Sequence, residues 1–387
     1  MTTADKIREL IAENGLSQRK FAEMVDMHYI TLGNNLKNDN FSHKSIEKIA
    51  DVFGLSVYDL LADEIQDRNA STDLVGYIEY NGEIIKIKSY SQFKKLADLI
   101  EYEVKVLPKE VKEIRTINKK NGQAIKKAKA NSDFQFNIYE FRTVQEYDAT
   151  KIDCWAFKTS KDKKGGIILD LGNQCSGYPF VFHGRTFHTS ETAYLCGQFS
   201  NDTAEHKQIQ ERLQEERNGY NAKKWIKNPN THLIRKDWEE FNAEWMLYVI
   251  WHKCKGNNDF ANKLKSLPVD AVIIENSTTV YESTNVFWGS INTELEEARN
   301  KVQRYTELEY SKMAKKEKKK NLPNLDDMKQ QARDEIQYIG TYKIGCNFMG
   351  KILKQCQLAL LNGTEPNINY ELFRERKIYL FGEELTF

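Results

Sequence analysis

Residues 179–194 read PFVFHGRTFHTSETAY, and this stretch decides how the carboxyl-terminal part of the chain is organised. Its phenylalanines favour β-structure, and the pair at 183–184 is a plausible turn. Thr189 or Ser190 can cap the helix that follows, so Glu191 falls in the first helical turn. Free N–H groups and the helix dipole favour a negative charge there. The pattern predicts a strand that leads into a helix, with one carboxylate at the junction.

Further short motifs accompany Glu191 in a fixed order along the chain. They are Leu171-Gly172-Asn173, Leu233-Ile234-Arg235-Lys236-Asp237-Trp238, Glu275-Asn276-Ser277, Phe287-Trp288-Gly289 and the segment from Gly345 to Leu353. The second of these motifs opens a predicted amphipathic helix that continues through Met246 and Ile250. A glutamate in a first helical turn is common in helices of any function. The accompanying motifs are therefore what makes Glu191 a candidate functional residue.

In this order the motifs, which span residues 151–360, resemble those of the NADAR family. The family pattern runs through L-S-N, P-F…G…(S/T)-x-E-H, L-R-x-D-W, W-G and G-x-N-x-(L/M)-G. The resemblance implies a mainly helical α+β domain that hydrolyses the bond between a ribose carbon and a nitrogen, without a cofactor. Some members act on ribosylamino-pyrimidine intermediates of riboflavin synthesis. Others remove ADP-ribose from guanine in DNA and reverse ADP-ribosyltransferase toxins, which implies a toxin–antitoxin or phage-defence setting.

The resemblance also implies roles for individual residues. Glu191 matches the family glutamate, which would stabilise or capture an oxocarbenium-like state at the anomeric carbon. Trp288 matches the tryptophan of W-G, whose indole would stack on a base or shield the sugar from water. The expected substrate-binding positions are Asn173, Gly184, Glu275, Gly289, Asn347 and Gly350.

Several positions depart from the family pattern. Thr192 stands where a histidine is usual, Leu195 and Gln198 where a glutamine and a lysine are common, and Ser290 where an acid often follows W-G. The missing lysine could have held a phosphate, and the missing acid could have been a general base. Two alternatives to a DNA ADP-ribosyl glycosidase therefore stay open. One is a small-metabolite N-glycosidase, and the other is a transcriptional regulator that binds an ADP-ribose or NAD-derived ligand without turnover.

Residues 4–62 predict a bundle of short helices, interrupted at Gly15-Leu16 and Asp26-Met27. The spacing resembles the Xre/Cro-type helix-turn-helix family, which implies an all-α domain over residues 1–66. Residues 28–37 would then enter a DNA major groove, and the module could pair into a homodimer on palindromic sites. The expected DNA-binding residues are Gln18, Arg19, Tyr29, Thr31, Asn34 and Asn35.

The charge of this amino-terminal segment gives less support to a role in DNA binding. Residues 1–64 hold seven lysines and arginines against eleven aspartates and glutamates. Release of counterions from DNA contributes little to the binding of such an acidic segment. A helix-turn-helix used for dimerisation or for binding a protein partner is therefore the alternative.

The segment between the two recognisable parts shows no family pattern. Residues 77–87 predict a hairpin with an Asn-Gly turn, and residues 89–102 predict a helix. A basic stretch follows at 105–129. At the far end of the chain, residues 377–387 predict a terminal strand or hairpin.

At 387 residues the chain is long enough for two or three domains. We expect a helix-turn-helix at 1–66, a connector at 67–150 and a NADAR-like domain at 151–387. A charged, helix-prone insertion covers about 293–340 and contains a second basic run at 312–320. A solvated helix face is the common alternative for such basic runs.

Composition narrows the remaining possibilities. No segment is apolar enough to span a bilayer, so we expect no membrane association. The six cysteines form no C-x-x-C pair and the seven histidines show no ligand spacing, which argues against a metal site and for a reduced, cytoplasmic protein. The net charge of +1 means that any affinity for DNA must come from local patches.

Overall fold

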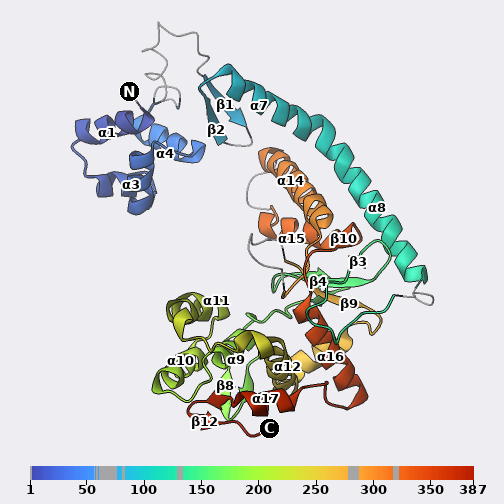
Figure 1. The fold of residues 1–387 in the computed structure, drawn as a ribbon. Coiled ribbons are helices and arrows are strands. Elements are labelled where there is room, and N and C mark those ends of the chain that lie inside the picture. Colours follow the sequence, from blue (N-terminus) through green and yellow to red (C-terminus); the bar gives the residue numbers. More distant parts are fainter. Residues whose placement is uncertain are drawn as a thin grey trace. The chain divides into compact units, whose positions relative to one another are not determined.

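The computed structural model describes residues 2–55, 57, 60, 76–80, 83–128, 134–277, 287–316 and 322–387. The chain divides into two compact units. Unit 1 comprises Met1–Lys109 and Tyr305–Pro323, and unit 2 comprises Glu110–Arg304 and Asn324–Phe387. Both are rich in helices, and the described strands form small two-stranded sheets (Figure 1). The expected multidomain α+β class is confirmed at this level, whereas the three predicted domain boundaries stay a prediction.

Unit 1 begins with four short helices around one core. These are α1 (Thr3–Glu13), α2 (Gln18–Met24), α3 (Tyr29–Asn38) and α4 (His43–Phe53). Each helix contributes a fully buried side chain, namely Ile7, Phe21, Leu32 and Ile49. Ser17 caps α2 as expected, because its Oγ accepts a hydrogen bond from the Lys20 N–H at 3.3 Å. The helix-turn-helix identity of this bundle stays a prediction.

The predicted hairpin and helix of the middle segment are confirmed. Strands β1 (Gly76–Tyr80) and β2 (Glu83–Ile87) are antiparallel, with Tyr80 opposite Glu83. Ser89 caps α7 (Tyr90–Glu101), which continues through the π-helical η1 (Tyr102–Val106) into α8 (Leu107–Ala128). The Asn81-Gly82 turn, most of the predicted helix at 57–61, Lys129 and Lys318 to Lys320 lie outside the described residues.

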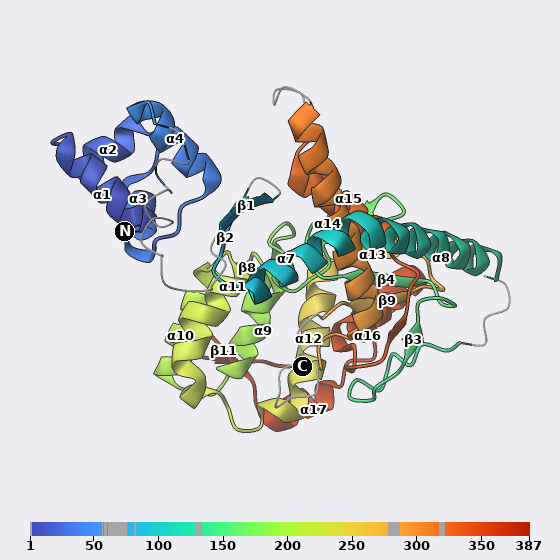
Figure 2. The ribbon, with the colours of Figure 1, turned by 90° about the horizontal axis from the view of Figure 1, so that it is seen from above.

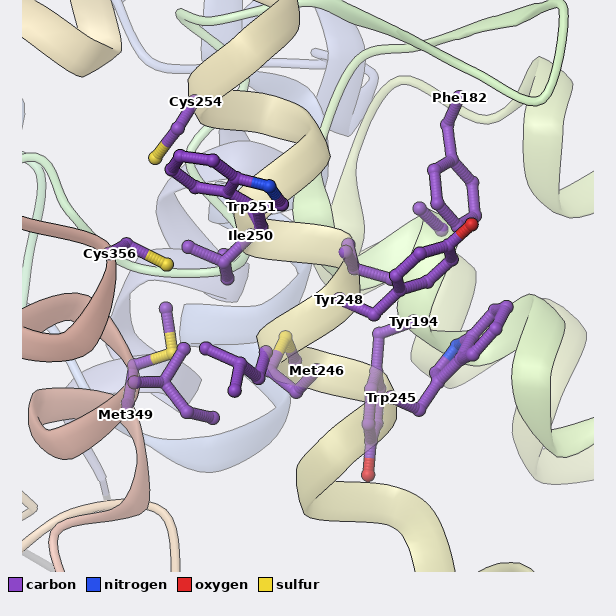
Figure 3. Close-up of a cluster of buried hydrophobic side chains, with 14 of the residues drawn as sticks. Phe182, Tyr194, Trp245, Met246, Tyr248, Ile250, Trp251, Cys254, Met349 and Cys356 are labelled. Atoms are coloured by element: carbon purple, nitrogen blue, oxygen red, sulfur yellow. The ribbon is translucent and has the colours of Figure 1, made fainter. Parts of the chain in front are cut away.

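The core of unit 2 is built on a buried helix. Helix α12 (Trp238–Gly256) lies between α9 (Ser190–Gln198) and α16 (Phe348–Asn362) and packs against both (Figures 1 and 2). Its aromatic and aliphatic side chains interlock with those of its neighbours (Figure 3). The prediction of an amphipathic helix here was wrong, because α12 is covered on nearly every side.

Two parallel strands lie beside this helical core. Strand β4 (Cys154–Phe157) pairs with β9 (Val272–Glu275), with Phe157 opposite Glu275. Asn276 forms a parallel bridge with Ser290 just beyond β9. The carboxyl ends of parallel strands meet at one edge, which is a common place for a ligand site. This edge brings residues from widely separated motifs together.

The stretch at 179–194 folds largely as predicted. Strands β7 (Phe180–Phe182) and β8 (Arg185–Phe187) form a hairpin. The turn residues His183 and Gly184 both have positive φ, which a tight turn requires. Thr189 then caps α9, since its Oγ1 accepts a hydrogen bond from the Thr192 N–H at 3.1 Å. Glu191 therefore lies in the first turn of α9, as expected.

The other described elements of unit 2 surround this centre. The helices are α10 (Ala204–Glu215), α11 (Gly219–Asn221), the π-helical η2 (Ala222–Lys227), the 3₁₀ segment η3 (Asn228–Leu233), α13 (Asn258–Ser266), α15 (Leu325–Glu335) and α17 (Tyr370–Arg376). The strands are β3 (Tyr147–Asp148), β5 (Lys163–Lys164), β6 (Ile167–Ile168), β10 (Thr341–Tyr342), β11 (Tyr379–Leu380) and β12 (Glu383–Glu384). Strands β11 and β12 form the predicted terminal hairpin.

The charged insertion is integrated into the fold over part of its length. It forms α14 (Thr293–Lys316) and α15. Within unit 2, Arg333 and Arg299 both pair with Glu296, at 3.1 and 3.2 Å. All three side chains are largely buried, so this part of the insertion packs through a salt-bridge network instead of extending into solvent. None of the helices in the described ranges combines the length and apolar character needed to cross a bilayer.

Candidate active site

A cavity of about 880 Å³ opens in unit 2 at the carboxyl ends of β4 and β9. Such a volume is typical of sites for nucleotide-sized ligands. It is lined by the loops that follow β4 and β9, the 172–175 loop, α9, η2, the first turns of α12, and Phe287-Trp288 with Phe348. Four of the predicted site residues face it together, namely Asn173, Glu191, Glu275 and Trp288.

Glu191 is held by the first turn of α9 and by the 172–175 loop. Its side chain is only 6% exposed. The Asn173 side-chain amide donates to Glu191 Oε2 at 3.3 Å, and the Glu191 N–H donates to the Asn173 carbonyl at 3.0 Å. Burial raises the pKa of Glu191, while Lys223, the Asn173 amide and Lys227 act in the opposite direction. Burial thus counteracts the ionisation that the helix end was expected to favour.

Glu275 provides a second carboxyl group in the same cavity. It ends β9, where its N–H donates to Asn347 Oδ1 at 3.1 Å. Burial and then the negative charge of Glu191 raise the pKa of Glu275 to about 7, although Lys223 opposes the shift. Two carboxyl groups whose charges repel do not ionise independently, so the pair holds a proton near neutral pH.

Two lysines that the sequence motifs did not single out complete the charge pattern. Lys223 and Lys227 lie one turn apart on η2, and both line the cavity. Their positive charges lower the pKa of Glu191 and so oppose the effect of its burial. Burial and then the charge of Lys223 lower the pKa of Lys227. One sequence signal could have revealed them: residues 217–236 contain six basic residues and no acidic residue.

Aromatic side chains form one wall of the cavity. The Trp288 ring meets Tyr194 and Phe348 edge-on, with centroids 5.1 and 5.6 Å apart. Tyr194 also packs against Trp238, at 5.0 Å. Backbone hydrogen bonds from residues 347–349 to the carbonyls of residues 287–289 hold the W-G motif in place. A flat base or a sugar face would find an apolar surface here.

Three buried polar atoms around the cavity have no hydrogen-bond partner among the described residues. They are Asn173 Oδ1, Gln198 Oε1 and Glu275 Oε2. Buried polar atoms in native proteins are nearly always hydrogen-bonded, so unpartnered ones at a cavity indicate where a ligand or water would bind. The three belong to three different segments of the chain, so a ligand that satisfies them would contact several walls.

The other predicted substrate-binding residues lie outside the cavity lining. Gly184 lies in the β7–β8 turn. A Cβ added at Gly289 would lie 2.4 Å from the Glu275 carbonyl oxygen, and one at Gly350 would lie 2.0 Å from the Ile273 carbonyl oxygen. Asn347 donates to that same Ile273 carbonyl at 2.9 Å. Gly289, Asn347 and Gly350 therefore allow close packing around β9 and position Glu275.

The positions that depart from the family pattern differ in where they lie. Gln198 lines the cavity, whereas Thr192 is buried in α9, where its Oγ1 donates to the Thr189 carbonyl at 2.9 Å. Ser290 is also buried, and it forms the bridge beside β9. Gln198 stands where a lysine is common in the family pattern, and it brings no charge to the cavity. Lys223 and Lys227 supply positive charge there instead.

The predicted DNA-binding residues lie in unit 1 on α2 and α3. Gln18, Arg19, Tyr29, Thr31 and Asn34 are exposed, and Asn35 is half-buried. Arg19 forms an exposed ion pair with Glu23 at 3.7 Å. These side chains are therefore accessible to a partner, while their role in DNA binding stays a prediction.

Comparisons with known proteins add little to these observations. No protein-family model matches the chain, and no curated protein matches its sequence. The NMR structure of the E. coli protein YbiA, a NADAR-family protein, aligns weakly with 48% of this chain and 96% of its own. The sequence identity is 17% and the TM-score is 0.29. A TM-score this low carries no argument, so the NADAR resemblance continues to rest on the sequence motifs.

Among the described residues, no group of three or more histidine, cysteine, aspartate or glutamate side chains is arranged to hold a metal ion. The cavity lining itself supplies carboxyl groups, lysines, amides and aromatic rings.

Proposed function

We propose that unit 2 is an N-glycosidase that hydrolyses a ribose C1–N bond, with ADP-ribose attached to guanine in DNA as its substrate. The observation that carries this proposal is that Glu191 and Glu275 line one large cavity, where burial and the charge of Glu191 raise the pKa of Glu275 to about 7. Cleavage of a glycosidic bond characteristically uses two carboxyl groups, one protonated and one ionised. The order of the NADAR-like motifs supports the same chemistry.

The two carboxyl groups take different roles in this proposal. Burial raises the pKa of Glu191, and Lys223, the Asn173 amide and Lys227 oppose that rise; the proposal assigns Glu191 as the ionised partner because these three groups surround its carboxylate. Its carboxylate stabilises the positive charge that develops at C1 as the C–N bond breaks. Glu275 is the protonated partner and donates its proton to the departing nitrogen, which keeps the electron pair of the bond. A water molecule then adds its oxygen to C1 and returns a proton to Glu275.

The surroundings of the carboxyl pair fit a ligand that carries phosphates and a base. Lys223 and Lys227 place positive charge at one wall, suited to a pyrophosphate. The aromatic wall around Trp288 offers a stacking surface for a base. The proposal further includes recruitment to DNA through α3 of unit 1, whose accessible side chains include Thr31 and Asn34.

A direct assay tests the proposal. The full chain is incubated with DNA that carries ADP-ribosylated guanine and, separately, with a ribosylamino-pyrimidine phosphate, and released ADP-ribose or free base is followed by chromatography. Release of ADP-ribose from DNA supports the proposal, and hydrolysis of the pyrimidine substrate alone would replace it with the small-metabolite function. Binding of free ADP-ribose without any turnover would identify a ligand-sensing regulator.

A further inference from the structure

An exposed group of aromatic and basic side chains lies on the segment that supplies Lys223 and Lys227 to the cavity. Tyr220 is 57% exposed and Trp225 is 60% exposed, although both are large aromatic residues. Lys224 lies over both rings, with its Nζ 5.7 Å from the Tyr220 centroid and 4.6 Å from that of Trp225. We call these three residues the rim platform. Adjacent exposed aromatic rings of this size are characteristic of binding surfaces.

The rim platform is attached to the candidate site through the backbone. Lys223, which lines the cavity, directly precedes Lys224, and consecutive Cα atoms are about 3.8 Å apart. On the other side of the platform, a Cβ added at Gly219 would lie 3.0 Å from the Glu191 Cβ. The platform therefore lies on the segment that supplies Lys223 to the cavity and that packs against Glu191 through Gly219.

The segment that carries the platform is anchored firmly. Ala222 and Ile226 are buried in the core of unit 2. Asn218 Oδ1 accepts hydrogen bonds from the N–H groups of Tyr220 and Asn221, at 2.9 and 3.2 Å. A stacking surface that is already fixed loses little conformational entropy when a partner binds.

The local charge specifies an anionic partner. Residues 217–236 contain Arg217, Lys223, Lys224, Lys227, Arg235 and Lys236 and no acidic residue. Arg235 is neutralised by Asp237, to which its Nε donates at 2.6 Å. Among the described residues, Arg217, Lys224 and Lys236 form no ion pair with an acidic side chain, and Lys223 and Lys227 act on the Glu191 carboxylate. The surface thus combines aromatic faces with excess positive charge.

We propose that the rim platform binds single-stranded nucleic acid, stacking an unpaired base on Trp225 next to the nucleotide held in the cavity. The proposal rests on the proposed function, because it needs a polynucleotide substrate in the cavity. Aromatic rings interleaved with lysines bind single strands through base stacking and phosphate contacts. In a duplex the base faces are already stacked on one another, so a duplex cannot use the ring of Trp225 in this way.

Binding to an unmodified strand tests the platform independently of catalysis. A fluorescein-labelled 12-nucleotide single-stranded DNA of mixed sequence is titrated with the full chain and followed by anisotropy. Trp225→Ala should weaken this binding by about fivefold or more. Tyr139→Ala is the matched control, since Tyr139 is 65% exposed and does not line the cavity, and it should bind as the parent does.

Two comparisons complete the binding test. Affinity for free ADP-ribose should be the same in Trp225→Ala and the parent, because the platform lies outside the cavity. Affinity for a blunt duplex of the same sequence should also be unchanged. Equal binding of the single strand by Trp225→Ala and the parent would overturn the proposal, as would absence of single-strand binding by the parent. A protein partner would remain as the alternative occupant in either case.

Turnover separates failure of the platform from failure of the proposed function. With ADP-ribosylated guanine in the 12-nucleotide strand, Trp225→Ala should raise KM, whereas with an ADP-ribosylated guanosine nucleotide KM should not change. If the parent hydrolyses neither substrate, the proposed function fails, and the binding titration still decides on the platform. If the parent hydrolyses both and Trp225→Ala changes neither KM, the platform alone is excluded.

Discussion

Glu191 is the residue on which the proposed chemistry depends most directly. Glu191→Gln should abolish turnover and change the affinity for ADP-ribose by less than about tenfold, because the amide keeps the shape of the side chain and loses its charge. Turnover on ADP-ribosylated DNA and calorimetric binding of ADP-ribose measure the two effects. Glu239→Gln is the control, since Glu239 also lines the cavity but is exposed. Full activity in Glu191→Gln would show that Glu191 only stabilises the start of α9 and takes no part in catalysis.

The raised pKa of Glu275 predicts how activity depends on pH. As the proton donor, Glu275 must be protonated, so kcat should fall as pH rises above about 7. In Glu191→Gln the neighbouring negative charge is gone, and the pKa of Glu275 should move down. A titration of Glu275 followed by NMR in the parent and in Glu191→Gln checks this shift. An unchanged pKa would show that the two carboxyl groups do not interact.

The same shift has a consequence for stability. The pKa of Glu275 is about 7 in the folded protein against an ordinary value of 4.5, so the folded state binds more protons between these pH values. The free energy of unfolding should therefore fall as pH rises from about 4.5 through 7. Glu275→Gln avoids this loss and should be more stable than the parent above pH 7, by up to about 3 kcal/mol, with little difference near pH 4. Urea denaturation at both pH values measures the difference.

Single residues were predictable from the sequence where local rules decide their position. Thr189 and Ser17 lie at helix starts, and a cap depends only on the few residues that follow it. The sequence also placed Glu191 in a first turn, but it could not reveal the burial that raises its pKa. Lys223 and Lys227 were missed for a related reason. Their place at the cavity depends on how η2 packs against α9, which no local pattern encodes.

At the scale of elements, the contact between α9 and α12 depends on one glycine. A Cβ added at Gly197 would lie 2.3 Å from Nε1 of the fully buried Trp245. Gly197→Ala should therefore destabilise unit 2 by about 1–3 kcal/mol, because the indole has no free space to move into. Gly177→Ala is the control, since nothing lies within 4 Å of a Cβ at that position. Equal melting temperatures for the two variants would show that α9 and α12 can separate without cost.

The element η2 gives a second prediction at this scale. Replacing both Lys223 and Lys227 with alanine should raise KM at least tenfold for substrates that carry a pyrophosphate, because about 1.4 kcal/mol of charge-assisted binding is lost. Burial of Glu191 would then be less opposed, and its pKa should rise further. Steady-state kinetics against Lys265→Ala, an exposed lysine on α13, measures the effect. An unchanged KM would place the phosphates elsewhere.

The helices and strands that could be predicted from the sequence are those that depend on a few neighbouring residues. The β1–β2 hairpin, α7 and the terminal hairpin each follow from short turn and cap signals. The sequence predicted the position of helix α12, but it did not predict that the helix is buried on nearly every side. Its polar residues indicated a solvent face, whereas Lys253 is buried against Ser190 Oγ at 3.2 Å and over the Phe260 ring. Tertiary packing decides such cases, and the sequence alone does not display it.

At the scale of the whole molecule, the sequence predicted a helix-turn-helix domain, a connector and a NADAR-like domain. The structure divides into two compact units. The parallel pairing of β4 with β9 joins segments more than a hundred residues apart, and it creates the edge at which Glu275 lies. Motif order indicated that Asn173, Glu191, Glu275 and Trp288 belong together. Only the fold shows how their segments meet, because pairing over such distances has no local signature.

The two units should contribute separately to recruitment and chemistry. The double substitution of Thr31 and Asn34 with alanine removes exposed side chains of α3 without touching its buried Leu32 and Leu36. The variant should hydrolyse a short ADP-ribosylated strand as the parent does, because the cavity lies wholly in unit 2. Its affinity for long duplex DNA at moderate salt should fall, because base-edge contacts in the major groove are lost. Filter binding to duplex and turnover on the short strand are measured together, with Asn40→Ala, an exposed asparagine after α3, as the control. If duplex binding is unchanged, the bundle serves dimerisation or a protein partner, which its excess of acidic residues would then explain.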